Sequence, residues 1–384
     1  MQVAGVYSSV QDRRSRASRG VWLASAAFAA GIALVPTGAS AESRSFVVSF
    51  FSQATTSVDG DCSKGVNPTI EEQYLLNLAH LGYSKEDIAE MAKKETEGNG
   101  NIGTIMMTRG RIDGQPVNAY AHPTAVVDPK LNPLDGRFAY GFDMDGKGRD
   151  DPDGFIDPET GQRGVDHQAY RALGCMRAFR GSLQGRPTFW DWAWGQLRDS
   201  QPAWLITIEG EDISQDGEVT VTFDRAIEFV ASNVDSSPRR DVTYRIDPDP
   251  RSHNVYKAKI KEGMLTLAEP GTADFRMLQN PLVTPELKMK RLHMRFELKA
   301  DGSMSGMLAG YQSWRELYFG IGSSGTREAC ITGDIPGIFY LLRANADGDP
   351  DQETKEPTTI STTYYIEAVP AIAVAVQPLN AAGG

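Results

Sequence analysis

The residues with the clearest capacity for chemistry are two runs of oxygen-bearing side chains. The first run lies between residues 143 and 159 and holds seven carboxylates within 17 residues. Turn glycines separate the acids, and flexible loops of hard oxygen ligands suit Ca²⁺, which takes about six to eight of them. The ligands predicted from this run are Asp143, Asp145, Asp151, Asp153 and Asp157.

Part of the first run resembles the loop of an EF-hand. Residues 153–156 have an acid, a turn glycine and an apolar residue at the spacing of the middle of that loop, and Asp151 lies two residues earlier. The resemblance then ends, because Arg149 and Thr160 occupy the first and last ligand positions and no helix pair is evident. It implies an EF-hand-like loop on another fold, or a longer cage reaching back to residues 143–145.

The second run covers residues 345–356. Oxygen-bearing side chains fall at loop positions 1, 3, 5, 7, 9 and 12, but Pro350 stands where an EF-hand has its turn glycine. The ligands predicted from this run are Asn345, Asp347, Asp349, Asp351 and Glu356.

These acidic runs have a simpler interpretation as solvated surface turns, since Asp, Gly and Pro are common turn residues. Two such runs in one chain favour at least one divalent-cation site. Ca²⁺ fits better than Mg²⁺, which rarely uses a dedicated all-protein cage.

A cysteine and a histidine offer a different chemistry. Asp166 and His167 precede Cys175 by a few residues, so a cysteine nucleophile with a histidine base is conceivable. An oxidising compartment favours a disulfide instead. The chain has three cysteines, and the sequence does not fix their pairing. Of the three possible pairs, Cys175 with Cys330 is preferred, which would leave Cys62 free.

Three tryptophans lie close together at Trp190, Trp192 and Trp194. On a strand they would share one face and could form a platform for a sugar ring. Large aromatic residues are more often core residues, and we favour that interpretation. His293 falls on the outer face of a predicted strand and is interpreted as a surface residue.

The first 41 residues have the order of a secretory signal. Four arginines, the first two being Arg13 and Arg14, precede an apolar stretch at 21–35, and the small residues 39–41 follow. We predict cleavage after Ala41 and a periplasmic or secreted protein without a transmembrane segment in the mature chain. The general secretory route is favoured over the twin-arginine route.

Composition agrees with an ordinary folded protein, with 40% hydrophobic and 23% charged residues. The formal net charge of −11 repels phosphate backbones and attracts cations, so nucleic acid is not an expected partner.

Periodicity predicts an α+β protein that is mainly β. Helices are expected at 69–81 and 84–97, the second beginning at a capping box of Ser84 and Asp87. Alternation of apolar and polar residues indicates several antiparallel strands, typical of a sandwich or an open barrel. We expect a β-sandwich-like body, a small N-terminal helical subdomain and long irregular acidic loops. The expected regions are a signal peptide (1–41), a helical and loop-rich region (42–188), the sandwich-like region (189–376) and a flexible tail (377–384).

The sequence therefore predicts an exported soluble protein that binds a divalent cation and has a non-catalytic binding or structural role, with a carbohydrate or envelope partner. The alternative is a secreted carbohydrate-active hydrolase with acidic catalysts and a tryptophan platform. A purely structural envelope protein without an ion is the third hypothesis. Nothing in the sequence decides whether the protein is an enzyme.

Overall fold

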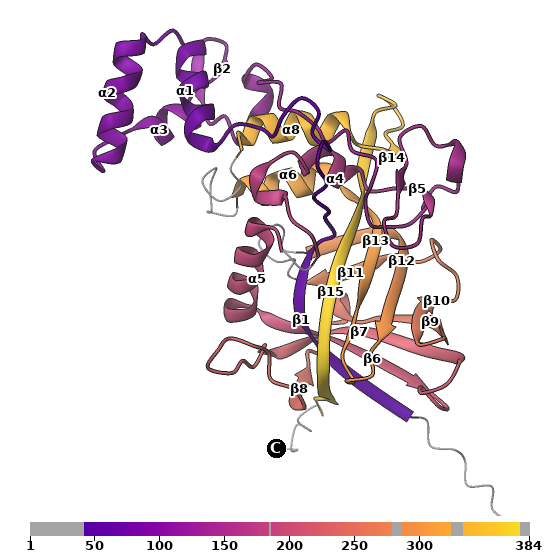
Figure 1. Cartoon of the computed structure of the whole chain (residues 1–384). Helices are drawn as coiled ribbons and strands as arrows, with labels where there is room; N and C mark the ends of the chain where they lie inside the picture. The colour runs from indigo at the N-terminus through magenta and orange to yellow at the C-terminus, as the bar shows by residue number, and fades with distance from the viewer. Residues whose placement is uncertain (1–41, 184–185, 279–285, 324–332, 377–384) are drawn as a thin grey trace, which may run out of the picture. The chain divides into compact units, whose positions relative to one another are not determined.

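The alternating segments of the sequence form strands that close into an eight-stranded antiparallel barrel. The structure, a computed structural model, describes residues 42–183, 186–278, 286–323 and 333–376 (Figure 1). Around the barrel, the strands are β1 (Glu42–Gln53), β6 (Pro202–Gly210), β7 (Gly217–Phe229), β9 (Asn254–Lys261), β10 (Met264–Leu267), β12 (Glu286–Leu298), β13 (Met304–Ser313) and β15 (Pro357–Ala375). The predicted signal segment 1–41, the tail 377–384 and Cys330 lie outside the described residues.

The predicted sandwich is wrong, because the first strand pairs with the last. β1 pairs with β6 on one side and with β15 on the other, from Ser45 opposite Ala371 to Gln53 opposite Tyr364. A sandwich and a barrel need the same alternation of inward and outward side chains. The feature that separates them is the pairing of distant strands, which alternation along the chain does not encode.

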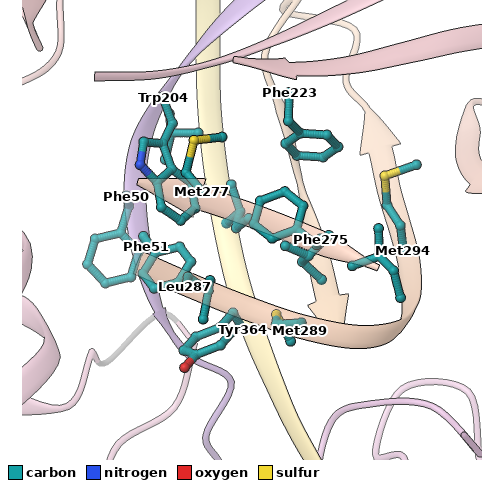
Figure 2. Close-up of a cluster of buried hydrophobic side chains, with 14 of the residues drawn as sticks. Phe50, Phe51, Trp204, Phe223, Phe275, Met277, Leu287, Met289, Met294 and Tyr364 are labelled. Carbon is teal, nitrogen blue, oxygen red and sulfur yellow. The ribbon is translucent and has the colours of Figure 1, made fainter. Parts of the chain in front are cut away.

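The apolar run Phe46–Phe51 is buried on both faces of β1. Phe51 points into the barrel, where its ring lies 5.1 Å from that of Trp204 and 4.6 Å from that of Tyr364 (Figure 2). Phe50 meets Trp194 of helix α5 (Thr188–Ser200) at 6.1 Å. A strand covered on both sides carries a continuous apolar run, and this explains the local sequence.

Aromatic and methionine side chains fill the barrel (Figure 2). Phe223 and Phe275 form an edge-to-face pair at 5.4 Å, the geometry that ring quadrupoles favour. Phe275 belongs to β11 (Phe275–Leu278), which pairs with β12 outside the main path. Two further additions lie on β15: β8 (Val242–Ile246), which runs parallel to it, and the short β14 (Gly348–Pro350).

The two predicted N-terminal helices are confirmed as α1 (Ile70–His80) and α2 (Lys85–Thr96). Each begins at a capping box, and the second uses the predicted Ser84 and Asp87. With α3 (Ile102–Met107) they form a small apolar cluster of their own.

A buried ion pair links this helical part to the barrel. Asp334 caps helix α8 (Ile335–Ala344), pairs with Arg109 and accepts a hydrogen bond of 3.1 Å from the side chain of Asn77 in α1. Helices α8, α6 (Trp314–Ser323) and α4 (Gln168–Leu173) lie together at one end of the barrel (Figure 1).

The connection between α3 and α5 contains little regular structure. Its short strands are β2 (Gly110–Ile112), β3 (Gln115–Val117), β4 (Phe155–Ile156) and β5 (Arg163–Val165). A disulfide joins Cys62 to Cys175 at the end of this connection. The preferred pairing of Cys175 with Cys330 is therefore wrong, and Cys175 carries no thiol for a cysteine–histidine pair.

Candidate metal centre

The first acidic run begins with a tight turn that aims two carboxylates in one direction. Asp143 accepts a hydrogen bond of 2.8 Å from the amide of Gly146, and Asp145 accepts one of 2.9 Å from the amide of Lys147. Gly146 has a φ of +78°, which glycine adopts without steric cost. The turn therefore follows from the local sequence.

A third carboxylate meets the first two. Oxygens of Asp143, Asp145 and Asp166 all lie within 4.8 Å of one another. Asp166 follows β5 and is 3% exposed, whereas Asp143 is half-buried and Asp145 is exposed. The group therefore has a buried side and a side that faces solvent.

Backbone hydrogen bonds fix Asp166 in this group. Its Oδ2 accepts hydrogen bonds from the amides of Met144 (2.6 Å) and Asp145 (3.0 Å), and its own amide donates to the carbonyl of Phe142 (2.8 Å). Burial raises the pKa of Asp166 to about 7, and the charges of Asp145 and Asp347 add to that shift while the two amides oppose it. The backbone hydrogen bonds therefore hold the Asp166 carboxylate in place, although burial destabilises its ionised form.

One carboxylate of the second acidic run, Asp347, adds to the rise in the pKa of Asp166. Asp347 accepts a hydrogen bond of 2.7 Å from the amide of Ser361 on β15. Surrounding protein raises the pKa of Asp347 toward about 6, the Ser361 hydrogen bonds oppose the shift, and the charge of Asp145 adds to it. The residue keeps an exposed surface, so solvent screening limits these effects. One carboxylate of the second run therefore acts electrostatically on the group of three, although it is not a member of that group.

Few positive charges face this cluster. Lys147 pairs with Asp145 at 2.6 Å but is largely exposed. Arg291 lies over the ring of the buried Tyr311 at 3.8 Å and also contacts Asp349 at 3.3 Å. Burial and the charges of Asp166 and Asp347 raise the pKa of Tyr311, which places its side chain among these carboxylates.

His293 also lies near the cluster, although the sequence placed it on the surface. Its ring is half-buried and lies 5.6 Å from that of Phe142, and its Nδ1 is 2.9 Å from the carbonyl of Arg291. Burial lowers the pKa of His293, and the charge of Asp143 opposes that shift.

The other residues predicted from the first run lie away from the cluster. Asp151 accepts a hydrogen bond of 3.0 Å from the amide of Asp153, as in an ordinary turn. Asp157 is fully buried and lies 3.2 Å from Arg295 in an ion pair.

The other residues predicted from the second run have separate partners too. Asn345 follows helix α8, and its side-chain amide donates a hydrogen bond of 2.8 Å to the carbonyl of Leu341 in that helix. Asp349 pairs with Lys290 at 2.9 Å, Asp351 accepts two backbone amides of its own turn, and Glu356 pairs with Arg343 at 2.6 Å.

Sequence reasoning missed Asp166 as a ligand, because it was considered only with His167. The ring of His167 is fully buried, with Nε2 2.9 Å from the carbonyl of Ala54 and Nδ1 3.3 Å from the amide of Thr363. Burial lowers the pKa of His167 to about 3, so the ring is neutral. The signal that could have found Asp166 is its position directly after a short strand that follows the acidic run.

The tryptophan run lies on helix α5 rather than on a strand. Trp194 is buried in the core against Phe50, as the favoured interpretation expected. The side chains of Trp190 and Trp192 lie outside the described residues.

Comparisons of the chain with protein-family models, with curated proteins and with solved structures found no match. Among the described residues, no helix is both long and apolar enough to cross a bilayer.

Proposed function

We propose that the protein binds one divalent cation, Ca²⁺, between Asp143, Asp145 and Asp166, with Asp347 as a neighbouring carboxylate. The observation that carries this proposal is the approach of three carboxylate oxygens to within 4.8 Å of one another. Backbone carbonyls and water would complete a shell of about six to eight oxygens, the number that Ca²⁺ prefers.

Electrostatics support a cation at this position. Burial is the largest cause of the raised pKa values of Asp166 and Asp347, and the like charge of Asp145 adds to both shifts. The lysine nearby is exposed and already paired with Asp145. A divalent ion would offset the repulsion among the carboxylates and would displace the proton from Asp166.

Ca²⁺ is proposed over Mg²⁺ because the carboxylates come from separate irregular segments. Ca²⁺ tolerates flexible geometry and variable ligand number, whereas Mg²⁺ demands a near-ideal octahedron and keeps several waters. The ion would tie the turn at 143–147 to β5 and would bring both next to the loop that carries Asp347. Its role would be to hold the long connection in place.

A binding or structural role is proposed rather than a catalytic one. Both ring nitrogens of His167, which follows Asp166 in the chain, face backbone groups of the protein, so this ring does not act as an acid or a base. Export to an oxidising compartment is also proposed. The arginine-rich start of the chain and the disulfide between Cys62 and Cys175 support it.

Thermal unfolding tests the proposal. Metal-free protein with and without CaCl₂ would be compared for the wild type, for Asp143→Asn with Asp145→Asn, and for Asp153→Asn with Asp351→Asn. The last pair makes the same charge change in two exposed turns. At a hundredfold excess over the dissociation constant, Ca²⁺ should stabilise the wild type and the control pair by about 2.7 kcal/mol. An equal shift in the first pair, or none in the wild type, would contradict the proposal.

A further inference from the structure

A cleft on the irregular connection has a charge opposite to that of the carboxylate group. It has a volume of about 230 Å³, and its charged lining residues are Arg137, Arg149, Arg163, Arg171, Asp135 and Asp151. In a protein with a net charge of −11, a small cleft lined by four guanidinium groups is unexpected. It has room for on the order of seven water molecules, more than one small ion needs.

Three of these arginines have no partner in the described part of the chain. Arg137, Arg149 and Arg163 are exposed and form no ion pair within 4.0 Å and no side-chain hydrogen bond. The two acids of the cleft accept hydrogen bonds from residues outside its lining. Asp135 accepts hydrogen bonds from the amide and hydroxyl of Ser63, and Asp151 accepts one from the amide of Asp153.

The fourth arginine forms a fixed floor for the cleft. Arg171 is half-buried and lies over the ring of Phe155 at 4.0 Å. It donates to Gln168 at 2.9 Å and to the carbonyl of Asp153 at 2.7 Å. Burial lowers its pKa, and the charges of Asp153, Asp151 and Asp135 oppose that shift. This guanidinium is therefore a partly desolvated and oriented cation.

Two glycines bring the rim arginines together. Gly164 has a φ of +76°, and a Cβ atom there would collide with the carbonyl oxygen of Gly148. Only glycine permits this approach of the two backbones. Arg149 follows Gly148 and Arg163 precedes Gly164 in the sequence, so this approach brings both arginines to the same cleft. Like charges held together in this way repel each other unless an anion lies between them.

We infer that this cleft binds a sulfate or phosphate group. A guanidinium presents a planar fork of donors that matches two oxygens of such a group, and several forks converge here. The group could be a free inorganic ion or an ester on a sugar, since the cleft has space beyond a single oxyanion. This site is distinct from the proposed cation site, although the segment 143–151 contributes to both.

Calorimetric titration at low ionic strength in EDTA tests the inference, since EDTA excludes an anion held through a bound cation. The probes are inorganic sulfate, inorganic phosphate, glucose 6-sulfate and glucose 6-phosphate, with glucose as the uncharged control. Tighter binding of the esters would identify a sugar-borne group, and equal binding would identify the free ion. Either result supports the oxyanion site.

The variants are Arg149→Gln with Arg163→Gln, Arg137→Gln alone, and Arg239→Gln. Arg239 is exposed and outside the cleft, so Arg239→Gln matches the single charge change of Arg137→Gln. The double variant should bind about tenfold more weakly or worse, because two charged hydrogen-bonding groups are lost. Arg137→Gln should weaken binding to a smaller extent and keeps the test open if the double variant does not fold. Absence of anion binding by the wild type, or an equal loss in Arg239→Gln, would overturn the inference.

Discussion

The amide of Met144 donates a hydrogen bond of 2.6 Å to the Oδ2 of Asp166. Met144 stands between Asp143 and Asp145, so this bond sets the distance from both of these acids to Asp166. The side chain of Met144 packs with Ala309 and Tyr311 of β13 and anchors the turn to the barrel. A loop acid and a strand-end acid thus become neighbours through backbone hydrogen bonds.

The first prediction concerns Asp166→Asn. The amide oxygen can accept the same two hydrogen bonds, but the buried charge is gone. We expect the metal-free variant to melt about 2 °C or more above the wild type at pH 8, because an ionised buried carboxylate is destabilising there. Added Ca²⁺ should no longer raise its melting temperature. A variant that melts lower without metal and still responds to Ca²⁺ would count against Asp166 as a ligand.

The second prediction concerns pH. Because the folded pKa of Asp166 is raised to about 7, the metal-free folded state holds a proton that the unfolded chain releases near pH 4. Ionisation of this group therefore removes stability as pH rises from about 4 to about 7.

Cation affinity should change in the opposite direction, because the cation needs the ionised carboxylate. We expect Ca²⁺ to bind about tenfold or more weakly at pH 5.5 than at pH 7.5. The raised pKa of Lys147 keeps that side chain charged in this range, and the lowered pKa of His293 limits its contribution. Calorimetry in buffers of different ionisation enthalpy would count the released protons. An affinity independent of pH would disagree with this account.

The third prediction separates one shared site from two independent loops. Asp347→Asn should weaken Ca²⁺ binding, because this carboxylate acts on Asp145 and Asp166. Asp351→Asn makes the same charge change in an exposed turn of the same run and should leave the affinity within about twofold. Calcium titration of the three proteins would measure this. Equal losses in the two variants would point to net charge alone.

These results mark the limits of prediction from the sequence. The helix starts at Thr69 and Ser84 were predictable because a capping box lies within four residues. The strand at residues 291–298, which belongs to β12, was predictable from the alternation of its apolar and polar side chains. Barrel closure was not, because it depends on β1 pairing with β15 at the far end of the chain.

The candidate site likewise has one part that can be predicted from the sequence and another part that cannot. The turn at Asp143 and Asp145 can be derived from its own sequence, since both side chains accept amides two or three residues on. The approach of Asp166 to that turn, and the electrostatic effect of Asp347 on Asp166, depend on tertiary packing. The pairing of Cys62 with Cys175 depends on it too, since the three cysteines offer no local signal.

The fourth prediction concerns that disulfide. Cys62→Ser with Cys175→Ser removes a crosslink that spans 113 residues. Loss of such a crosslink should lower the free energy of unfolding by about 2–5 kcal/mol. Denaturant unfolding of the oxidised wild type, the reduced wild type and the double variant would measure it. The two proteins without the crosslink should agree with each other, and a double variant as stable as the oxidised wild type would contradict the expected contribution.

The central claim is a single cation site that depends on Asp143, Asp145 and Asp166. Its most direct test is calorimetric titration of Ca²⁺ into EDTA-treated and then chelator-free protein at pH 8, beside the variant Asp143→Asn with Asp145→Asn. We predict one bound Ca²⁺ per chain in the wild type and none in the variant. Two ions per chain, unchanged binding in the variant, or no heat of binding in the wild type would contradict the claim.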